Sequence, residues 1–344
     1  MLTILITGCS MHSFDLITEM RANYENEEIK VVGINCAEDA LLRKGVDAGY
    51  VVPRITEPDY LPIVLDICKK EGVDVIIPFI TAELPIMAEN RSFFENEGIK
   101  VSVATKEALD IVGDKTNLAK ICGDVMPKQA VVSSIDDIEA FARSVGYPGK
   151  NICCKLPNRC GGLGFCVIDE EKGKDLTIVN KFGLNRYITF DMLKVYAAEA
   201  LKNGEKLIVQ EYEDGVDFSL CILADNGEIT HALGFEAGLM AYGSAMFAKI
   251  AFSDEALEIA KYITKYSNLD GNACFDFMLK PDGRVKLLEC NPRVSATLPF
   301  IARAGLNLPY LRCKQLLGYD ISKYNIVVNP ELKMSKNYES EYYV

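Results

Sequence analysis

The sequence has only two histidines and no C-x-x-C pair, although 12 of its 344 residues are cysteine. Without a Cys/His cluster, nothing in it indicates a zinc site. The cysteines lie scattered in apolar segments, as at Cys68, Cys221 and Cys290. That distribution is typical of buried, reduced thiols rather than of a disulfide framework, so we expect a cytoplasmic protein.

Long runs of one residue type are missing as well. No Lys/Arg run exceeds two residues and the net charge is −12, which argues against nucleic-acid binding but leaves room for a local basic pocket. No apolar stretch approaches the ~18 residues of a membrane-spanning helix. Residues 1–14 lack the basic start of a signal peptide. We therefore expect neither a membrane span nor a signal peptide.

Two common nucleotide-binding motifs are absent. Gly8 follows the first apolar run without a G-x-G-x-x-G pattern, which disfavours an NAD-dependent dehydrogenase. Lys155 precedes the nearby glycine-rich stretch 157–165 instead of following it, and no Lys-Ser/Thr pair opens a helix there. The stretch is therefore not a Walker A loop.

What the chain contains first is an alternation of short apolar runs with helical patterns over residues 1–112. This order predicts a doubly wound parallel sheet, with its ligand crevice at the carboxyl ends of the strands, near Ser10 and Glu83. A length of 344 residues predicts two or three units. The predicted elements are strands at 2–7, 29–35, 73–79 and 99–104 and a helix at 59–72.

After residue 113 the pattern changes to helices mixed with antiparallel strands, an α+β arrangement. Two strands, 271–280 and 283–290, are joined by a tight turn and form a predicted hairpin. The other predicted elements are helices at 134–146, 191–204 and 254–268, strands at 128–132, 151–156, 166–169, 206–212, 217–225 and 228–236, and a glycine-rich apolar loop at 237–246.

The predicted hairpin ends in LLECNPRV, where Glu289, Asn291 and Arg293 are spaced to share one face of a strand. Asp276 lies in the preceding strand, and across a hairpin it can face Glu289. With Asn291 these carboxylates make an oxygen-only set that suits Mg²⁺ bound together with phosphates. Arg293 can hold a phosphoryl group. Alone, the triplet also fits a solvated strand end with an ion pair.

Lys155 is a second candidate for phosphate binding, because it ends an apolar strand just before Gly161, Gly162 and Gly164. Glycines let backbone N–H groups approach phosphate oxygens closely, and the lysine supplies positive charge. A hairpin turn with a lysine at the strand end explains the same residues.

In order along the chain, these pieces resemble the ATP-grasp superfamily, in particular the ATP-binding halves of carbamoyl phosphate synthetase large subunits and their stand-alone relatives. The ordered motifs are Asp114-Lys115, Lys155 with its glycine loop, VQEYEDGVD at 209–217, Asp276, and Glu289-x-Asn291-Pro292-Arg293. The resemblance covers nearly the whole chain. It implies an ATP-grasp fold, α/β and α+β, behind an N-terminal Rossmann-like pre-ATP-grasp domain.

The resemblance also implies domain limits. Residues 1–112 would be the pre-ATP-grasp domain, residues 113–320 the ATP-grasp domain, and residues 321–344 a C-terminal extension. Within the ATP-grasp domain, a mobile lid would occupy about 125–213 and the catalytic subdomain about 214–320.

Roles for individual residues follow from the same resemblance. The residues implied to bind ATP are Lys115, Lys155, Gly161, Gly162, Gly164, Gln210, Glu211, Tyr212 and Asp217. Those implied to hold Mg²⁺ (or Mn²⁺) are Asp276, Glu289 and Asn291. Arg293 and Lys155 are implied to be catalytic, Arg293 by stabilising the transferring γ-phosphoryl group. Asp217 would contact the ribose, where the family more often has glutamate.

The implied activity is that of an ADP-forming carboxylate–amine ligase, which activates a small-molecule carboxylate as an acyl phosphate for attack by an amine. A homodimer is compatible with this activity. Two alternatives stay open: carboxylation through carboxyphosphate, and a nucleotide-binding regulatory protein without turnover. We expect the stretch 237–246 and the strand ends near Ser10 and Glu83 to line the acceptor pocket.

Two departures from the relatives narrow the activity. Biotin carboxylases carry a Gln-Val-Glu-His run after the arginine, whereas VSATLPF follows Arg293 here, which disfavours biotin-dependent carboxylation. Carbamoyl phosphate synthetases use two tandem halves and this chain has one, so we do not expect it to make carbamoyl phosphate in that manner.

Overall fold

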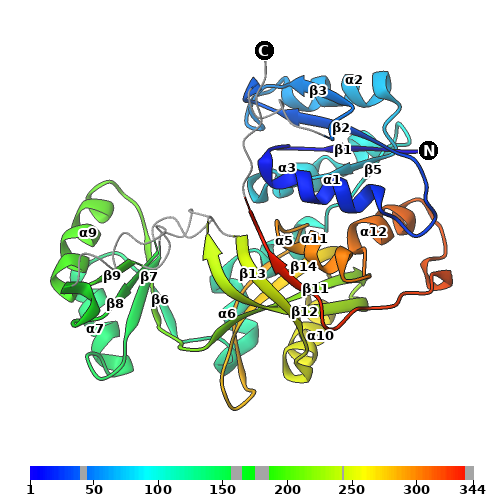
Figure 1. Ribbon diagram of the computed structural model, residues 1–344. Helices are drawn as coiled ribbons and strands as arrows, with labels where there is room; N and C mark the ends of the chain where they lie inside the picture. The colour runs from blue at the N-terminus through cyan, green and yellow to red at the C-terminus, as the bar shows by residue number, and fades with distance from the viewer. Residues whose placement is uncertain (39–44, 156–164, 175–185, 242–243, 338–344) are drawn as a thin grey trace.

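The computed structural model describes residues 1–38, 45–155, 165–174, 186–241 and 244–337, and in these ranges the strands form three sheets (Figure 1). None of the helices described is both long and apolar enough to span a membrane.

The N-terminal part is a five-stranded parallel sheet of order β3-β2-β1-β4-β5, as the alternating pattern predicts. Its strands are β1 (Leu2–Ile6), β2 (Ile29–Asn35), β3 (Ala48–Val51), β4 (Val75–Ile77) and β5 (Lys100–Val101). Its helices are α1 (Phe14–Arg21), α2 (Tyr60–Glu71), α3 (Leu84–Glu89), α4 (Arg91–Glu95) and α5 (Lys106–Val112). Strand β3 was not predicted; it is a four-residue edge strand in which half-buried and exposed residues alternate, and its apolar run is short.

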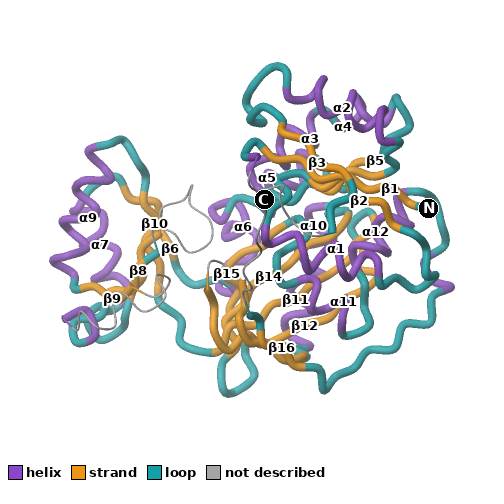
Figure 2. The backbone as a smooth tube through the Cα atoms, turned by 45° about the horizontal axis from the view of Figure 1, so that its top comes forward, coloured by secondary structure: helices purple, strands orange, loops and turns teal. Residues whose placement is uncertain are grey.

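The second sheet, which we call the lid sheet, has the order β6-β10-β7-β8-β9 and carries helices α7 and α9. Its elements are β6 (Gln129–Val132), α7 (Ile135–Val145), β7 (Ile152–Lys155), β8 (Cys166–Ile168), β9 (Arg186–Ile188), α9 (Phe190–Lys202) and β10 (Leu207–Glu211). It has a core of its own, built from residues such as Ile138, Cys154 and Leu193. Figures 1 and 2 both show it standing apart from the other two sheets.

The third sheet, the central sheet, has the order β15-β14-β11-β12-β13-β16 and is antiparallel throughout. Its strands are β11 (Val216–Asp225), β12 (Glu228–Ala241), β13 (Ser244–Ala251), β14 (Gly271–Leu279), β15 (Val285–Asn291) and β16 (Lys333–Ser335). The helices around it are α6 (Lys115–Cys122), α10 (Asp254–Ser267), α11 (Leu298–Arg303) and α12 (Leu308–Leu316).

The predicted loop at 237–246 is wrong. Strand β12 continues to Ala241, and β13 begins at Ser244, with Ala237 opposite Ala248 and Ala241 opposite Ser244. The segment is rich in alanine and glycine, which have little strand propensity of their own, and the antiparallel pairing of β12 with β13 supplies the strand instead.

Helix limits follow local capping chemistry. Helix α7 begins after Ser134, whose hydroxyl accepts from the N–H of Asp137 at 3.1 Å, and ends at Gly146 in the left-handed region. Helix α10 begins after Ser253 in the same way and ends at the left-handed Asn268. These caps explain why both predicted helices are confirmed to within a residue or two.

The N-terminal sheet and the central sheet share two apolar cores, to which no described residue of the lid sheet contributes. In one of them Leu109 and Val112 of α5 belong to the same buried cluster as Phe275 and Leu287 of the central sheet. The two sheets are thus packed together as the base of the molecule. The lid sheet is packed around a core of its own.

Candidate active site

The three predicted metal ligands meet on the hairpin of β14 and β15. The register places Asp276 opposite Glu289 and Cys274 opposite Asn291. The amide Nδ2 of Asn291 donates to Oδ2 of Asp276 at 2.9 Å and to Oε1 of Glu289 at 3.1 Å. The hairpin therefore brings two carboxylates and one amide to a single point, as the sequence predicts.

Sequence reasoning missed Ser219 on the neighbouring strand β11. It lies opposite Asp276, and its hydroxyl donates to Oδ1 of Asp276 at 2.6 Å. Asp217 precedes it by two residues, and so it lies on the same face of β11. The signal was the alternation of Asp217 and Ser219 within an apolar strand, but it becomes readable only once the register of β11 against β14 is known.

Lys115 reaches this cluster from the start of α6. Asp114 caps the helix, since its carboxylate accepts from the N–H groups of Thr116 at 2.8 Å and Asn117 at 2.9 Å. The cap fixes Lys115 as the first helical residue, and its Nζ lies 2.5 Å from Oε2 of Glu289. The predicted phosphate lysine and the predicted metal ligand are ion-paired.

The pKa values of the carboxyl groups of Glu289 and Asp276 are shifted in opposite directions. Burial alone would raise the pKa of Glu289, but the adjacent Lys115 ammonium overrides it and holds that pKa at about 2. Burial and then the charge of Glu289 raise the pKa of Asp276 to about 7, although the Ser219 hydroxyl opposes this. Two carboxylates held so close repel each other, and a bound cation would relieve that repulsion.

Lys155 ends β7 in the lid sheet, close enough to the cluster for Lys115 and Glu289 to act on it electrostatically. Burial and then the Lys115 charge lower the pKa of Lys155. The two predicted phosphate lysines thus lie near each other, one on the base and one on the lid. Gly161, Gly162 and Gly164, predicted to follow as a phosphate loop, lie outside the described residues.

The predicted adenine residues lie at the end of β10. Gln210 is buried, and its Nε2 donates to Oε1 of Gln129 at 3.4 Å. The backbone N–H groups of Glu211 and Tyr212 are engaged within the lid, with Lys128 at 2.9 Å and with Asn151 at 3.1 Å. An adenine base bound at this strand end would therefore have to form hydrogen bonds with groups other than the N–H groups of Glu211 and Tyr212.

Arg293 departs from the predicted shared strand face. Strand β15 ends at Asn291, because Pro292 has no N–H to pair and the N–H of Arg293 turns back onto the Asn291 carbonyl at 2.8 Å. The guanidinium Nε donates to the hydroxyl of Thr81 at 2.8 Å, and Nη1 donates to the carbonyl of Val294 at 2.9 Å. The side chain is directed toward the N-terminal sheet, where sequence reasoning assigned no role to Thr81.

Glu83 lies at one of the strand ends that we expect to border the acceptor pocket. Its side chain is buried, and its carboxylate accepts hydrogen bonds from the hydroxyl of Thr7 and, at 3.3 Å, from that of Tyr60. Burial raises the pKa of this carboxyl. Glu83 therefore connects Thr7, which follows β1, to Tyr60 of α2 through buried hydrogen bonds.

The donor set fits a hard divalent cation. Among the described residues no group of three or more His, Cys, Asp or Glu side chains is arranged to hold a metal ion. Asp276, Glu289 and Asn291 form a smaller, oxygen-based set, and Mg²⁺ usually takes one or two carboxylates together with phosphate oxygens and water. Because Nδ2 of Asn291 now donates to both carboxylates, its amide must turn before Oδ1 can serve as a ligand.

A five-stranded lid, an antiparallel central sheet with carboxylates on its last hairpin, and lysines from both sides define an ATP-grasp fold behind a parallel N-terminal sheet. Two family models match: "PylC-like, N-terminal domain" over residues 4–102, and "ATP-grasp in the biosynthetic pathway with Ter operon" over residues 203–339. The predicted resemblance to the ATP-grasp superfamily is thereby confirmed.

Carbamoyl phosphate synthase large chains are similar to this chain over most of its length. The carbamoyl phosphate synthase large chain of Methanothrix thermoacetophila is 23% identical over 337 residues, which is 94% of this chain but only 29% of that protein. The chain spans less than a third of the length of such relatives.

Solved structures share the fold. An ADP complex of N5-carboxyaminoimidazole ribonucleotide synthetase has a TM-score of 0.68 at 12% identity, covering 96% of this chain and 80% of the other. An L-amino acid ligase from Bacillus licheniformis has a TM-score of 0.65 at 14% identity, covering 96% and 78%.

Proposed function

We propose that this chain is an ATP- and Mg²⁺-dependent carboxylate–amine ligase that forms ADP. The observation that carries the proposal is the meeting of Asp276, Glu289 and Asn291 on one hairpin, with Lys115 at 2.5 Å from Glu289 and Lys155 close by. Such a set combines metal ligands with cations for phosphate, and the proposed reaction requires no side-chain nucleophile. This composition suits phosphoryl transfer by positioning and charge stabilisation.

In the proposed reaction, a carboxylate oxygen of the substrate attacks the γ-phosphorus of ATP and ADP leaves. The nitrogen of an amine then attacks the acyl carbon, phosphate leaves, and the amine loses a proton. Mg²⁺, when bound by Asp276, Glu289 and Asn291, would neutralise phosphate charge. Lys115 would exchange Glu289 for a phosphate oxygen, and Lys155 would add a second positive charge from the lid.

Arg293 is proposed to stabilise the negative charge that develops on the transferring phosphoryl group. Its Nε and Nη1 are held by Thr81 and Val294, so the guanidinium is fixed in orientation while a further edge can still bind oxygen. A donor fixed in advance costs little reorganisation when charge develops.

The lid sheet is proposed to close over ATP. It carries Lys155 and the predicted adenine residues Gln210 to Tyr212, and its core is separate from those of the base. The domain limits at 112 and 320 and a lid over about 125–213 belong to this proposal. Asp217, at the start of β11 beside the lid, is proposed to contact the ribose.

An ADP-release screen tests the function. The protein is incubated with ATP, Mg²⁺ and amino acids, singly and in pairs, with other small carboxylates and amines added as a second panel. ADP release that needs both an acid and an amine, and that chelation of Mg²⁺ abolishes, is the expected result. Release that depends on bicarbonate instead supports the carboxyphosphate route. ATP binding without any release supports the regulatory alternative.

A further inference from the structure

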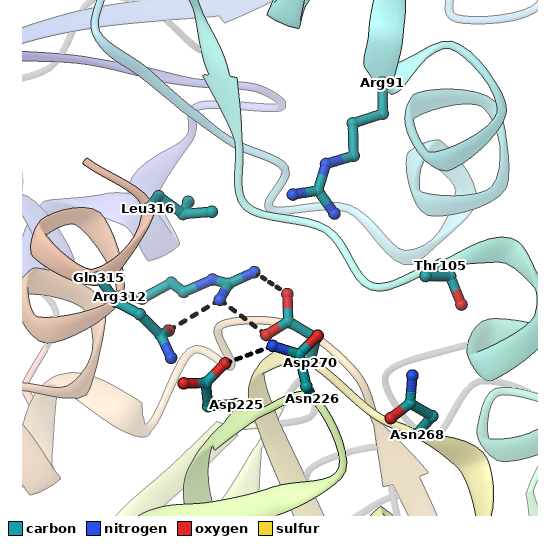
Figure 3. Close-up of a pocket in the computed structure, with 9 residues that line it drawn as sticks. All are labelled: Arg91, Thr105, Asp225, Asn226, Asn268, Asp270, Arg312, Gln315 and Leu316. Atoms are coloured by element: carbon teal, nitrogen blue, oxygen red, sulfur yellow. Dashed lines mark hydrogen bonds and ion pairs between the residues drawn. The ribbon is translucent and has the colours of Figure 1, made fainter. Parts of the chain in front are cut away.

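A second polar pocket lies at the opposite end of strand β14 from the proposed active site. It has a volume of about 270 Å³ and is formed at the junction of the N-terminal and central sheets (Figure 3). Asp270 precedes β14, and Asp276 lies six residues further along, a separation of ~20 Å at the rise of an extended strand. A ligand bound in this pocket would therefore lie too far from the proposed active site to be a substrate of the ligation.

The floor of the pocket is rigid and electrically balanced. Arg312 on α12 is 2% exposed, and its Nη atoms bind Asp270 at 2.5 and 3.0 Å. Nη1 also donates to Oε1 of Gln315 at 2.8 Å. Because this arginine and this carboxylate neutralise each other, neither supplies net charge to a ligand.

Two further charged side chains, Arg91 and Asp225, reach the pocket from different parts of the fold (Figure 3). Arg91 comes from α4 beside the N-terminal sheet; its Nε is ion-paired with Glu95 at 2.8 Å, its Nη1 makes a long hydrogen bond of 3.5 Å to the Val103 carbonyl, and its Nη2 makes no hydrogen bond within the described part of the chain. Asp225 is the last residue of β11 and accepts one hydrogen bond, from Asn226 at 2.7 Å. Among the described residues it has no cation within ion-pair distance, so its charge is available.

Amide groups occupy the space between these charges. Asn268 caps α10 in the left-handed conformation, and its side-chain amide makes no hydrogen bond within the described chain. The Nε2 group of Gln315 is likewise unused, since only Oε1 is bonded to Arg312. The pocket thus offers one guanidinium edge, one carboxylate and two amides, with Leu316 as an apolar wall.

We propose that this pocket binds a free polar α-amino acid. The carboxylate of the ligand pairs with Arg91, its ammonium group pairs with Asp225, and a polar side chain bonds to Asn268 and Gln315. A dianion such as phosphate is disfavoured by the unpaired charge of Asp225, and a simple cation by the guanidinium of Arg91. The volume is below the ~300–1,000 Å³ of typical drug-sized sites, which suits a molecule as small as an amino acid.

Calorimetric titration of the full chain with L-glutamine tests this site without ATP. Glutamine is the probe because it carries both charges and an amide side chain. Glutaramic acid, which lacks the ammonium group, and 4-aminobutanamide, which lacks the carboxylate, should each bind at least about 10-fold more weakly. Arg91→Gln and Asp225→Asn should weaken glutamine binding by a similar factor.

Control variants separate this site from others. Arg143→Gln and Asp282→Asn remove one charge of each sign from exposed ion pairs and should bind glutamine like the wild type. Glu289→Gln, in the proposed active site, should also bind glutamine normally, which distinguishes failure of this inference from failure of the proposed function. Absence of saturable glutamine binding, or unchanged binding by Arg91→Gln and Asp225→Asn with wild-type melting curves, would overturn the proposal.

Discussion

The Nε atom of Arg293 donates a hydrogen bond to the hydroxyl of Thr81 at 2.8 Å, joining the end of β15 to the segment that follows β4 in the N-terminal sheet. The bond connects residues 212 positions apart in the sequence. It suggests that the N-terminal sheet has a direct part in the proposed site, because it sets the direction of the arginine.

Replacing Arg293 by alanine should lower kcat by roughly 10² or more, the loss typical of one preorganised charge donor. ATP affinity should change much less, because the arginine is proposed to act mainly in the transition state. Steady-state kinetics, a nucleotide-binding titration and a thermal melt are the measurements. Full activity combined with a lowered melting temperature would show that the contact with Thr81 is merely structural.

Thr81→Val should produce a smaller defect of the same kind. The substitution keeps the shape but removes the hydroxyl, and the loss of one neutral hydrogen bond corresponds to about 3- to 10-fold in kcat. Thr81→Ser restores the hydroxyl and should restore kcat. If Thr81→Val changed KM for ATP and left kcat unaffected, Thr81 would not position Arg293.

Glu289→Gln should abolish turnover and leave the fold intact. The amide preserves the volume but removes the negative charge that Lys115 meets at 2.5 Å and that a metal ion would need. ADP release and a melting curve are compared with those of Glu258→Gln, which breaks an exposed ion pair with Lys261 on α10. Near wild-type ADP release by Glu289→Gln would contradict the site.

Local signals in the sequence were enough for the hairpin that carries this site. The turn between two apolar runs fixes which strands pair, and pairing places Asp276 opposite Glu289. Arg293 was placed wrongly because a two-residue spacing implies a shared face only while the strand continues, and here it ends at Asn291. Proline at the next position was the available warning.

Features that depend on distant segments could not be predicted. Ser219 and Thr81 reach the site through the register of β11 and the packing of the N-terminal sheet, neither of which local patterns specify. Strand β13 was missed for a related reason. Its alternation is weak, and its position comes from pairing with β12 and with β16, which lies more than 80 residues later.

Stability at low pH should depend on Glu25. Lys314 first, and then Lys323 and Tyr310, lower the pKa of Glu25 from 4.5 to about 2 in the folded protein. The ionised form is thus favoured by folding, so its contribution is fully present above pH 4.5 and is lost as the pH falls toward 2.

Glu25→Gln removes this contribution at every pH. Near neutral pH it should lower the free energy of unfolding by about 1 kcal/mol, the upper range for partly exposed ion pairs. The difference between variant and wild type should shrink as the pH falls through the same window. Urea unfolding at several pH values measures it, and a difference that stays constant with pH would rule out the role of this carboxylate.

The buried pair of Arg312 and Asp270 should contribute far more to stability than exposed pairs do. Their side chains are 2% and 15% exposed, and the bonds are 2.5 and 3.0 Å long. Arg312→Met leaves Asp270 without its partner in a poorly solvated place, which should cost about 3–5 kcal/mol.

The matched control is Arg143→Met, in a pair whose arginine is 71% exposed and whose charged atoms are 3.5 Å apart. It should cost about 0–1 kcal/mol. Adding Asp270→Asn to Arg312→Met should recover part of the loss, because the stranded charge is then gone. Equal denaturation midpoints for the two single variants would mean that water reaches Asp270 freely and that the floor of the second pocket is not the rigid, neutralised surface described above.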